Sequence, residues 1–520
     1  MDTATDAARP AAPAGSGRDH VVVFPFMAKG HILPLLHLAS ALAALPTGDA
    51  GATASLRVTV VTTPGNLAFA RRRLPARVAL VALPFPAHPV LPPGAESADA
   101  LPSHSLFPAF LRATALLREP FASYLASLPA PPPLALVSDF FLGFTQRVAD
   151  AAGVPRVTFH GMSAFSLALC FSLATAPRPP PPPPIENGID GGAAALRVPG
   201  FPEGFTIAED EVPHAVAQAA DVDDPVTRFL LDEVRDWEHR SWGVLVNSFD
   251  ALDGDYAPLL ESFYLPGARA WLVGPLFLLA AAGEDVDGDE DPEGCLPWLD
   301  ERAEGSVVYV SFGTQAHVSA AQLDELAHGL VGSGHAFLWA VRSSSDSDAW
   351  SPPVDAGAAG GKVVRGWVPQ RRVLAHPAVG GFLSHCGWNS VLESMAAGRP
   401  VLAWPVMAEQ AANAKHVSDV LGAGVRAGVK AGLGSGAAPE LVGRERVAAK
   451  VRELMDGGEA GERMRARAED VGRAARAAVG EGGTSRLALQ RMVDELRWSY
   501  GGGGGDDDER RDAARAEPNV

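Results

Sequence analysis

Cysteine is scarce in this sequence. Only three cysteines occur among 520 residues, at positions 170, 295 and 386, and they lie far apart. Such wide spacing indicates neither a disulfide framework nor a zinc site. The sequence therefore predicts a fold that depends on neither cross-links nor a structural metal.

Long uncharged segments are also rare. The first 19 residues contain no apolar run of the kind found in secretion signals, so we expect no signal peptide. Residues 157–177 lack Asp, Glu, Lys and Arg, but they contain His160, several serines and a threonine, and they lead into a proline run. A strand followed by a buried helix fits this segment better than a membrane span. We expect a cytoplasmic protein without stable membrane insertion.

Positive charge is in deficit, with 43 Lys and Arg against 61 Asp and Glu and a net charge of −18. This balance argues against nucleic acid or an anionic membrane as a partner. It leaves room for an anionic nucleotide, which needs only a local positive field. With 47% hydrophobic and 20% charged residues, the composition is that of a globular protein. A chain of this length predicts two domains with tails.

Buried strands alternate with helices along the chain. Continuous apolar or β-branched runs predict strands at these positions: 20–24, 57–62, 78–83, 134–139, 244–249, 307–311, 336–342 and 379–384. Helical patterns follow most of these runs. This alternation predicts an α/β fold with parallel sheets.

Two residues of the first half follow strand ends. His31 begins a helix after the strand at 20–24, and Asp139 ends the strand at 134–139. Ligands bind at this edge of a doubly wound sheet, so the carboxylate could orient the imidazole and stabilise its protonated form. The positive helix end is expected to keep His31 neutral. In isolation, a histidine at such a turn is more often structural, and the commonest role for a residue placed like Asp139 is that of a helix cap.

Residues 367–410 gather groups suited to a nucleotide sugar. Trp367 offers a flat face, and Gln370 follows one helical turn later. The strand at 379–384 turns through a glycine into a helix starting near Asn389, which presents N–H groups and a positive dipole to a phosphate. Plainer interpretations remain open here. Ser390 and Glu393 have the spacing of a capping box, Trp388 and Trp404 could be core aromatics, His385 a core histidine, and Glu409 with Gln410 a solvated edge.

This stretch resembles the signature box of plant UDP-dependent glycosyltransferases, which starts W-x-P-Q, contains H-C-G-W-N-S and ends E/D-Q. Similar landmarks extend the resemblance over nearly all of residues 20–498. They are Gly30-His31, Ser138-Asp139, residues 247–249, residues 271–275 and residues 311–314. The departures are small: Val368 stands where Ala is usual, Arg399 where Val is frequent, and Glu409 where Asp is common.

The resemblance implies a fold of two facing Rossmann-like domains (GT-B type) with a cleft between them. The expected divisions are a disordered N-terminus (1–19), an acceptor-binding domain (20–278), an acidic linker (279–294), a UDP-sugar-binding domain (295–478), a C-terminal helix returning to the first domain (479–498) and a disordered tail (499–520).

The resemblance also implies roles for individual residues. His31 would be the general base and Asp139 its partner. The donor-binding residues would be Trp367 on the uracil, with Val368 beside it, Gln370 and Glu393 near the ribose, Thr314, His385, Asn389 and Ser390 on the diphosphate, and Trp388, Glu409 and Gln410 on the sugar. For the acceptor pocket we expect apolar walls that could equally be core: Phe140, Phe141, Phe159, Met162 and Phe165.

The predicted activity is an inverting, metal-independent transfer of a sugar, with UDP-glucose as the expected co-substrate and no cofactor. No Asp-x-Asp motif lies beside the box. The acceptor would be a hydroxyl of a small apolar or phenolic plant metabolite. UDP-galactose or UDP-xylose are alternative donors, an epimerase or hydrolase is an alternative enzyme, and a sugar-nucleotide sensor is the alternative without catalysis. We expect a monomer.

Overall fold

The computed structural model describes residues 19–45, 56–175, 195–217, 221, 223–280, 290–313, 318–341, 350–428 and 441–501. The predictions for Thr314, for residues 281–289 of the linker and for the terminal segments 1–18 and 502–520 lie outside these ranges. Two expected tail boundaries need correction. The Arg497 Nε donates to Asp19 Oδ1 at 2.9 Å, and the last helix, α20, continues to Gly501.

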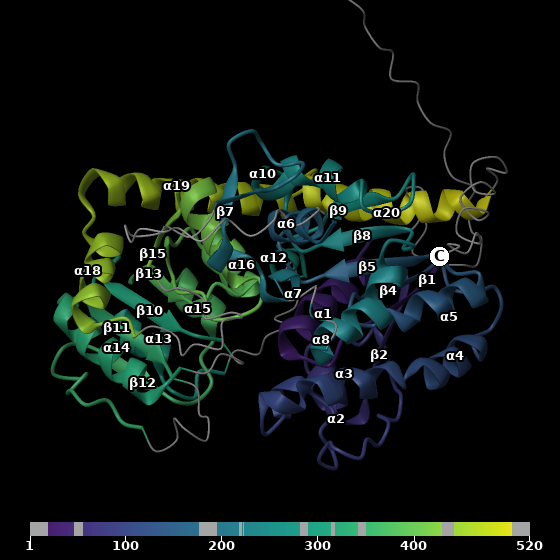
Figure 1. Ribbon diagram of the computed structural model, residues 1–520, viewed down its shortest axis with the longest axis horizontal. Coiled ribbons are helices and arrows are strands. Elements are labelled where there is room, and N and C mark those ends of the chain that lie inside the picture. Colours follow the sequence, from purple (N-terminus) through teal and green to yellow (C-terminus); the bar gives the residue numbers. More distant parts are fainter. Residues whose placement is uncertain are drawn as a thin grey trace, which may run out of the picture.

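Two parallel sheets confirm the α/β class (Figure 1). The first sheet has the strand order β3 (Ala79–Ala82), β2 (Arg57–Thr62), β1 (His20–Phe24), β4 (Ala135–Asp139), β5 (Arg156–His160), β8 (Gly243–Val246) and β9 (Arg269–Leu272). The second has the order β12 (Lys362–Val364), β11 (Ala336–Ala340), β10 (Val307–Ser311), β13 (Val379–Ser384), β14 (Val401–Ala403) and β15 (Gly424–Arg426). A short antiparallel pair, β6 (Ala195–Arg197) and β7 (Thr206–Ala208), stands apart from both.

The central strands are buried on both faces, which explains their continuous apolar runs. In β1, Val21 and Val23 belong to one core cluster, while Val22 and Phe24 belong to a second on the opposite face. In β10, Val308 and Val310 likewise separate from Val307 and Tyr309. Helices therefore cover each sheet from both sides, as parallel connections require.

The helices of the first domain are α1 (Lys29–Ala43), α2 (Pro64–Arg71), α3 (Phe107–Ala115), α4 (Arg118–Ala126), α5 (Phe144–Ala152), α6 (Ala164–Thr175), α7 (His214–Ala217), α8 (Pro225–Phe229), α9 (Asp236–Glu238), α10 (Asp250–Asp253), α11 (Ala257–Glu261) and α12 (Leu276–Ala280). Those of the second are α13 (Cys295–Asp300), α14 (Ala320–Ser333), α15 (Gln370–Ala375), α16 (Trp388–Ala396), α17 (Gln410–Lys415) and α18 (Arg444–Met455).

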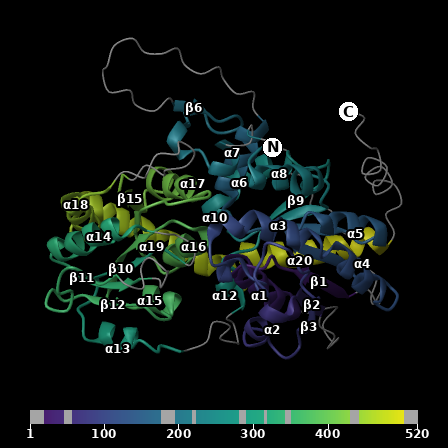
Figure 2. The same cartoon turned by 60° about the horizontal axis from the view of Figure 1, so that its bottom comes forward.

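The last two helices connect the domains (Figure 1 and Figure 2). Helix α19 (Gly458–Val479) packs Ala468, Val471 and Ala475 into the core cluster around α16. Helix α20 (Thr484–Gly501) contributes its apolar side chains to the core of the first sheet instead: Leu489, Met492, Val493 and Leu496. The last described helix therefore packs on the same sheet as the first described strand.

The two domains also share apolar contacts. Phe249 and Phe277 from the first domain belong to one buried cluster with Trp388 and Val391 from the second. The edge of the first sheet where its strands end thus lies close to the N-terminus of α16. The residues predicted to act on donor and acceptor come from these two places.

Candidate active site

The structure brings His31 and Asp139 together. His31 lies in the first turn of α1, and Asp139 is the last residue of the neighbouring strand β4. The His31 Nδ1 is 2.8 Å from Asp139 Oδ2, and the Phe141 N–H donates to the other carboxylate oxygen at 3.1 Å. The carboxylate is fully buried, so both its oxygens are held in place. With Nδ1 donating to Asp139, the His31 Nε2 keeps a lone pair that can accept a proton.

The pKa of His31 is shifted in the direction opposite to the one predicted. Burial lowers the pKa of His31, but the charge and hydrogen bond of Asp139 raise it, and the charges of Glu409 and Asp99 raise it further. The net result is a pKa above the ordinary value of 6.5. The expected effect of the helix end is therefore outweighed by Asp139, which was predicted as the partner of His31, and by Glu409 and Asp99, which were not predicted near it.

One of these carboxylates, Asp99, was missed in the sequence. Its Oδ2 accepts a hydrogen bond from the Lys29 N–H at 2.6 Å, at the start of α1. The N-cap residue Ala28 has no side chain that could do this. The Ala98 N–H also donates to the carbonyl of Met27 at 2.8 Å. The segment at 98–99 therefore caps the helix that carries His31, although no local pattern links it to that helix.

The turn between β13 and α16 is built as a phosphate site would require. Cys386 has a φ of 65°, and its N–H donates to Ser384 Oγ at 3.1 Å. Helix α16 begins at Trp388 after Gly387, which provides no side-chain cap. Ser390 lies inside the first turn, so the capping-box interpretation of Ser390 and Glu393 was wrong. The first-turn N–H groups of α16 have no acceptor within the helix and suit an anion.

His385 is held between two glycines at this turn. A Cβ on Gly313 would lie 2.6 Å from His385 Nε2, and one on Gly387 would lie 2.5 Å from the same atom. Burial lowers the pKa of His385 to about 4, and the carbonyl of Ser311 opposes this shift only in part. The imidazole is therefore neutral near pH 7. It can donate a hydrogen bond to a phosphate oxygen but cannot act as a counterion.

The side chain of Gln370 is hydrogen-bonded to two other predicted donor-binding residues. Its Nε2 donates to Ser390 Oγ at 3.0 Å and to Glu393 Oε2 at 2.8 Å, while its Oε1 accepts from the Tyr309 hydroxyl at 3.1 Å. Trp367, three residues earlier, is 45% exposed. The exposed indole could stack on a nucleobase, and the amide and carboxylate could hydrogen-bond to the hydroxyls of a ribose.

Glu409 and Gln410 lie at the start of α17. The Gln410 Oε1 accepts from the N–H groups of Val406 and Met407, both at 2.9 Å, which fixes the amide and leaves its NH₂ group to donate elsewhere. Burial raises the pKa of Glu409, while hydrogen bonds and the charge of His31 lower it in part. The charges of Glu409 and His31 each shift the pKa of the other group, so the two predicted site residues interact electrostatically.

Asn413 is a second residue that was missed. It is fully buried, and its Nδ2 donates to the carbonyl of Cys386 at 2.9 Å and to Glu409 Oε1 at 3.2 Å. Its Oδ1 accepts from Ser163 at 3.4 Å and from Ser166 at 2.7 Å, both in the first domain. One amide thus connects the turn at Cys386 and the carboxylate of Glu409 to the opposite domain. Its position four residues after Glu409 was the only sequence signal.

Asn389 makes a direct bond between the domains. Its Nδ2 donates to the carbonyl of Gly30 at 2.8 Å. Gly30 precedes His31 in the first turn of α1, and Asn389 is the second residue of α16. The positive ends of two helices therefore meet next to His31, which favours binding of an anion between them.

Two of the predicted donor-binding residues are buried in cores, and a third lies outside the described residues. The side chain of Trp388 is buried in the core between the domains, and its Nε1 donates to the carbonyl of Asn247 at 2.8 Å. A sugar could then meet only its main chain, and the core interpretation holds for Trp388 and also for Trp404. Val368 is buried in the core of the second domain. Thr314 lies outside the described residues.

The predicted acceptor walls divide into two groups. Phe140 and Phe141 are partly exposed, with ring centres 6.1 and 5.5 Å from that of His31. Met162 is partly exposed just after β5. Phe159 and Phe165 are fully buried in core clusters and cannot line a pocket as predicted. The alternation of β5 and the packing of α6 on α17 turn these two rings inward.

Within the described ranges, no three His, Cys, Asp or Glu side chains are grouped so that they could hold a metal ion. None of the helices in these ranges is long and apolar enough to cross a membrane.

The chain is similar in sequence to known glycosyltransferases. Residues 284–435 match the family model described as UDP-glucoronosyl and UDP-glucosyl transferase. UDP-glycosyltransferase 73B4 of Arabidopsis thaliana is 35% identical, over 92% of this chain and 98% of its own. Scopoletin glucosyltransferase of Nicotiana tabacum is 33% identical, with the same shares covered.

Solved structures show the same fold. UGT73P12 of Glycyrrhiza uralensis, complexed with glycyrrhetinic acid 3-O-monoglucuronide, has a TM-score of 0.77 at 29% identity, covering 92% of this chain and 96% of that one. UGT2 of Phytolacca americana, complexed with UDP-2fluoro-glucose and pterostilbene, has a TM-score of 0.72 at 27% identity, covering 92% and 99%.

Proposed function

The chain belongs to the plant UDP-glycosyltransferases, and on this premise we propose that it transfers glucose from UDP-glucose to a hydroxyl of a small phenolic or apolar metabolite, with inversion at the anomeric carbon. The observation that carries the proposal is the His31–Asp139 pair, 2.8 Å apart, beside two converging helix N-termini. A base and an anion site next to each other are what this reaction requires.

The steps follow from the placement of the groups. The His31 Nε2 takes the proton of the acceptor hydroxyl as the oxygen attacks the anomeric carbon. The bond from that carbon to the diphosphate oxygen breaks on the opposite face, so an α-linked donor gives a β-glycoside and UDP leaves. Asp139 stabilises the imidazolium that forms.

The leaving diphosphate is stabilised by the N-termini of α16 and α1 and by a hydrogen bond from neutral His385. We assign no step to a metal or cofactor, because the negative charge that develops on the leaving UDP lies next to these hydrogen-bond donors. Trp367 would stack on the uracil, and Gln370 with Glu393 would bind the ribose. Tyr309 and Ser390 are hydrogen-bonded to the side-chain amide of Gln370, and that amide in turn donates to Glu393.

Glucose is favoured as the donor because Gln410 at the last position of the box and Trp388 at its centre are the combination associated with it in the family. The relative from Nicotiana tabacum is named a glucosyltransferase, and the structure from Phytolacca americana holds a fluorinated UDP-glucose. For the acceptor, the partly exposed side chains of Phe140 and Phe141 suit an aromatic or apolar molecule. Scopoletin and pterostilbene, which occur in the names of these two relatives, are both phenolic. We propose in addition a monomer in the cytoplasm.

The test is glycoside formation from UDP-glucose, UDP-galactose and UDP-xylose with a panel of phenolic and terpenoid alcohols. His31→Ala is compared with His239→Ala, a histidine on the surface of the same domain. We expect His31→Ala to lose two or more orders of magnitude in rate, roughly the share contributed by general-base catalysis, and His239→Ala to match the native protein. Equal rates for all three proteins would disprove the assignment of the base. Donor binding without product from any acceptor would favour a sensor.

A further inference from the structure

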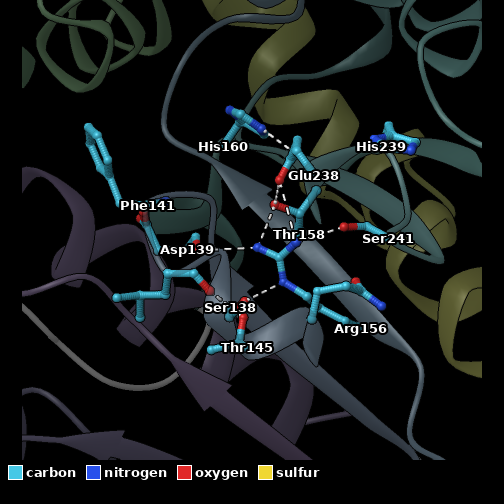
Figure 3. A network of polar contacts seen from close by, with 12 residues as sticks. Ser138, Asp139, Phe141, Thr145, Arg156, Thr158, His160, Glu238, His239 and Ser241 are labelled. Atoms are coloured by element: carbon cyan, nitrogen blue, oxygen red, sulfur yellow. Dashed lines mark hydrogen bonds and ion pairs between the residues drawn. The ribbon is translucent and has the colours of Figure 1, made fainter. Parts of the chain in front are cut away.

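A fully buried arginine holds the strand end that carries Asp139. Arg156 lies on β5, and its Nε donates to Ser138 Oγ at 2.8 Å (Figure 3). Its Nη2 donates to the carbonyl of Asp139 at 3.4 Å. The Ser138 hydroxyl also contacts Thr145 Oγ1 at 2.7 Å, at the start of the next helix. Arg156 therefore holds the side chain of the residue before Asp139 and the main-chain carbonyl of Asp139 itself.

A single carboxylate, Glu238, balances this charge and gathers the surrounding donors. Its Oε2 accepts from Arg156 Nη1 at 3.4 Å and from the Thr158 hydroxyl at 3.0 Å. Its Oε1 pairs with His160 Nε2 and with the Tyr264 hydroxyl, both at 2.7 Å. Burial raises the pKa of Glu238, but these partners overcome it and hold the pKa at about 2. The group is therefore ionised and fully hydrogen-bonded, which a buried charge requires.

The network has two branches. The first runs from Arg156 to Ser138 and Asp139, and the second runs through His160 to the aromatic residues near the base. The ring of His160 stacks on Phe140, with centres 4.6 Å apart and planes 13° apart. Phe140 in turn stacks on Phe141 at 4.2 Å, and both rings lie beside His31. Both branches therefore end on the four consecutive residues 138–141, which hold the partner of the base and the exposed aromatic rings.

We propose that Glu238 is a positioning residue for sugar transfer, acting through Arg156 on Asp139 and through His160 on Phe140. The inference rests on the proposed function. A buried ion network is seldom the most stabilising way to fill a core, because apolar side chains of equal volume often serve as well. Here every branch fixes a group that must be placed accurately for the acceptor oxygen to lose its proton in line with the bond that breaks.

The experiment compares Glu238→Gln with Tyr264→Phe in the full-length protein. Glu238→Gln removes the charge that holds both branches, whereas Tyr264→Phe removes one hydrogen bond to the same carboxylate and leaves both branches in place. For Glu238→Gln we expect kcat to fall about ten- to a hundredfold, since misplacing a reacting group by about 1 Å can cost two orders of magnitude. The Kd for UDP should stay within about twofold, because the donor residues lie in the other domain.

For Tyr264→Phe, a lower melting temperature with a native kcat is the expected result. The inference is overturned if Glu238→Gln keeps the native kcat, or if Tyr264→Phe loses as much kcat at an equal loss of melting temperature. Should Glu238→Gln fail to fold, Ser138→Ala decides, because it removes the hydroxyl that accepts from Arg156 and leaves the charges paired. A native kcat in that variant also overturns the inference.

The second branch has its own measurement. His160→Gln keeps a donor for Glu238 but removes the ring that supports Phe140, so the KM for a phenolic acceptor should rise about tenfold while the KM for UDP-glucose stays unchanged. His31→Ala is measured in the same series. Native activity in that variant refutes the proposed function, whereas an inactive His31→Ala beside a native Glu238→Gln refutes only the positioning role.

Discussion

Replacing Asp139 with asparagine tests the base most sharply, because the structure dictates how the new amide must sit. The Phe141 N–H donates to Oδ1 of Asp139, so the oxygen of an asparagine would keep that place. Its NH₂ group would then face His31 Nδ1, 2.8 Å away in the native protein. The imidazole would have to accept that hydrogen bond at Nδ1 and carry its proton on Nε2, where it can no longer act as a base.

The magnitude can be estimated from the same distance. At 2.8 Å and an effective dielectric constant of about 20, the attraction between an imidazolium and the carboxylate is at most about 6 kcal/mol. This upper limit corresponds to about four orders of magnitude in rate. The imidazolium charge is shared over the ring, so we expect Asp139→Asn to lower kcat by about two to four orders of magnitude.

The assay is the initial rate of glycoside formation at saturating UDP-glucose, with calorimetric UDP titration to show that the donor site is intact. Thermal melting reports any loss of fold. A rate within about threefold of native, with UDP binding preserved, would refute the role of Asp139 as the partner that sets the tautomer and stabilises the imidazolium.

Two further predictions concern protonation and the phosphate turn. Burial lowers the pKa of His31, but its neighbouring carboxylates raise it above its ordinary value, so kcat/KM should fall as the pH drops through this raised pKa and the base becomes protonated. In a pH–rate profile, Asp99→Asn should move that fall to lower pH, because the variant lacks one of the charges that raise the pKa. An unmoved profile would contradict the role of the Asp99 charge. Gly313→Ala and Gly334→Ala both place a side chain at positive φ, so each should cost about 1–2 kcal/mol in thermal unfolding. Only Gly313→Ala would also strike the ring of His385, so it alone should weaken UDP binding in a titration, by about tenfold.

The sequence predicted the parts of the fold that depend on local pattern. Buried parallel strands such as 20–24 and 379–384 are continuous apolar runs, and the structure confirms the α/β class built from them. The turn at 385–387 could also be placed, because a strand, a glycine and a helix follow one another within a few residues.

Contacts between distant residues could not be predicted in this way. Nothing near Asp99 or Asn413 indicates that the first caps the helix of His31 and the second joins Glu409 to the opposite domain. The pairing of Arg156 with Glu238 spans 82 positions. Such polar contacts are set by how the elements pack, and no periodicity along the chain records them.

Burial of aromatic residues was the other source of error. Phe159 and Phe165 occur in apolar surroundings like those of Phe140, yet the first two fill cores and the third remains partly exposed. Phe140 escapes burial because it follows the end of a strand, whereas Phe159 lies within one. A shift of one residue at the end of a strand therefore decides whether an aromatic side chain is buried in the core or remains partly exposed.

The return of α20 to the first sheet has a consequence for biosynthesis. The strands of that sheet leave the ribosome first, but four apolar side chains of their core arrive only with residues 489–496. At about 5–20 residues per second, the 200 or so residues in between take roughly ten to forty seconds to synthesise. During that interval the nascent chain exposes an apolar face, which is the kind of surface that chaperones bind. The first domain to be synthesised is therefore the last to complete its apolar core.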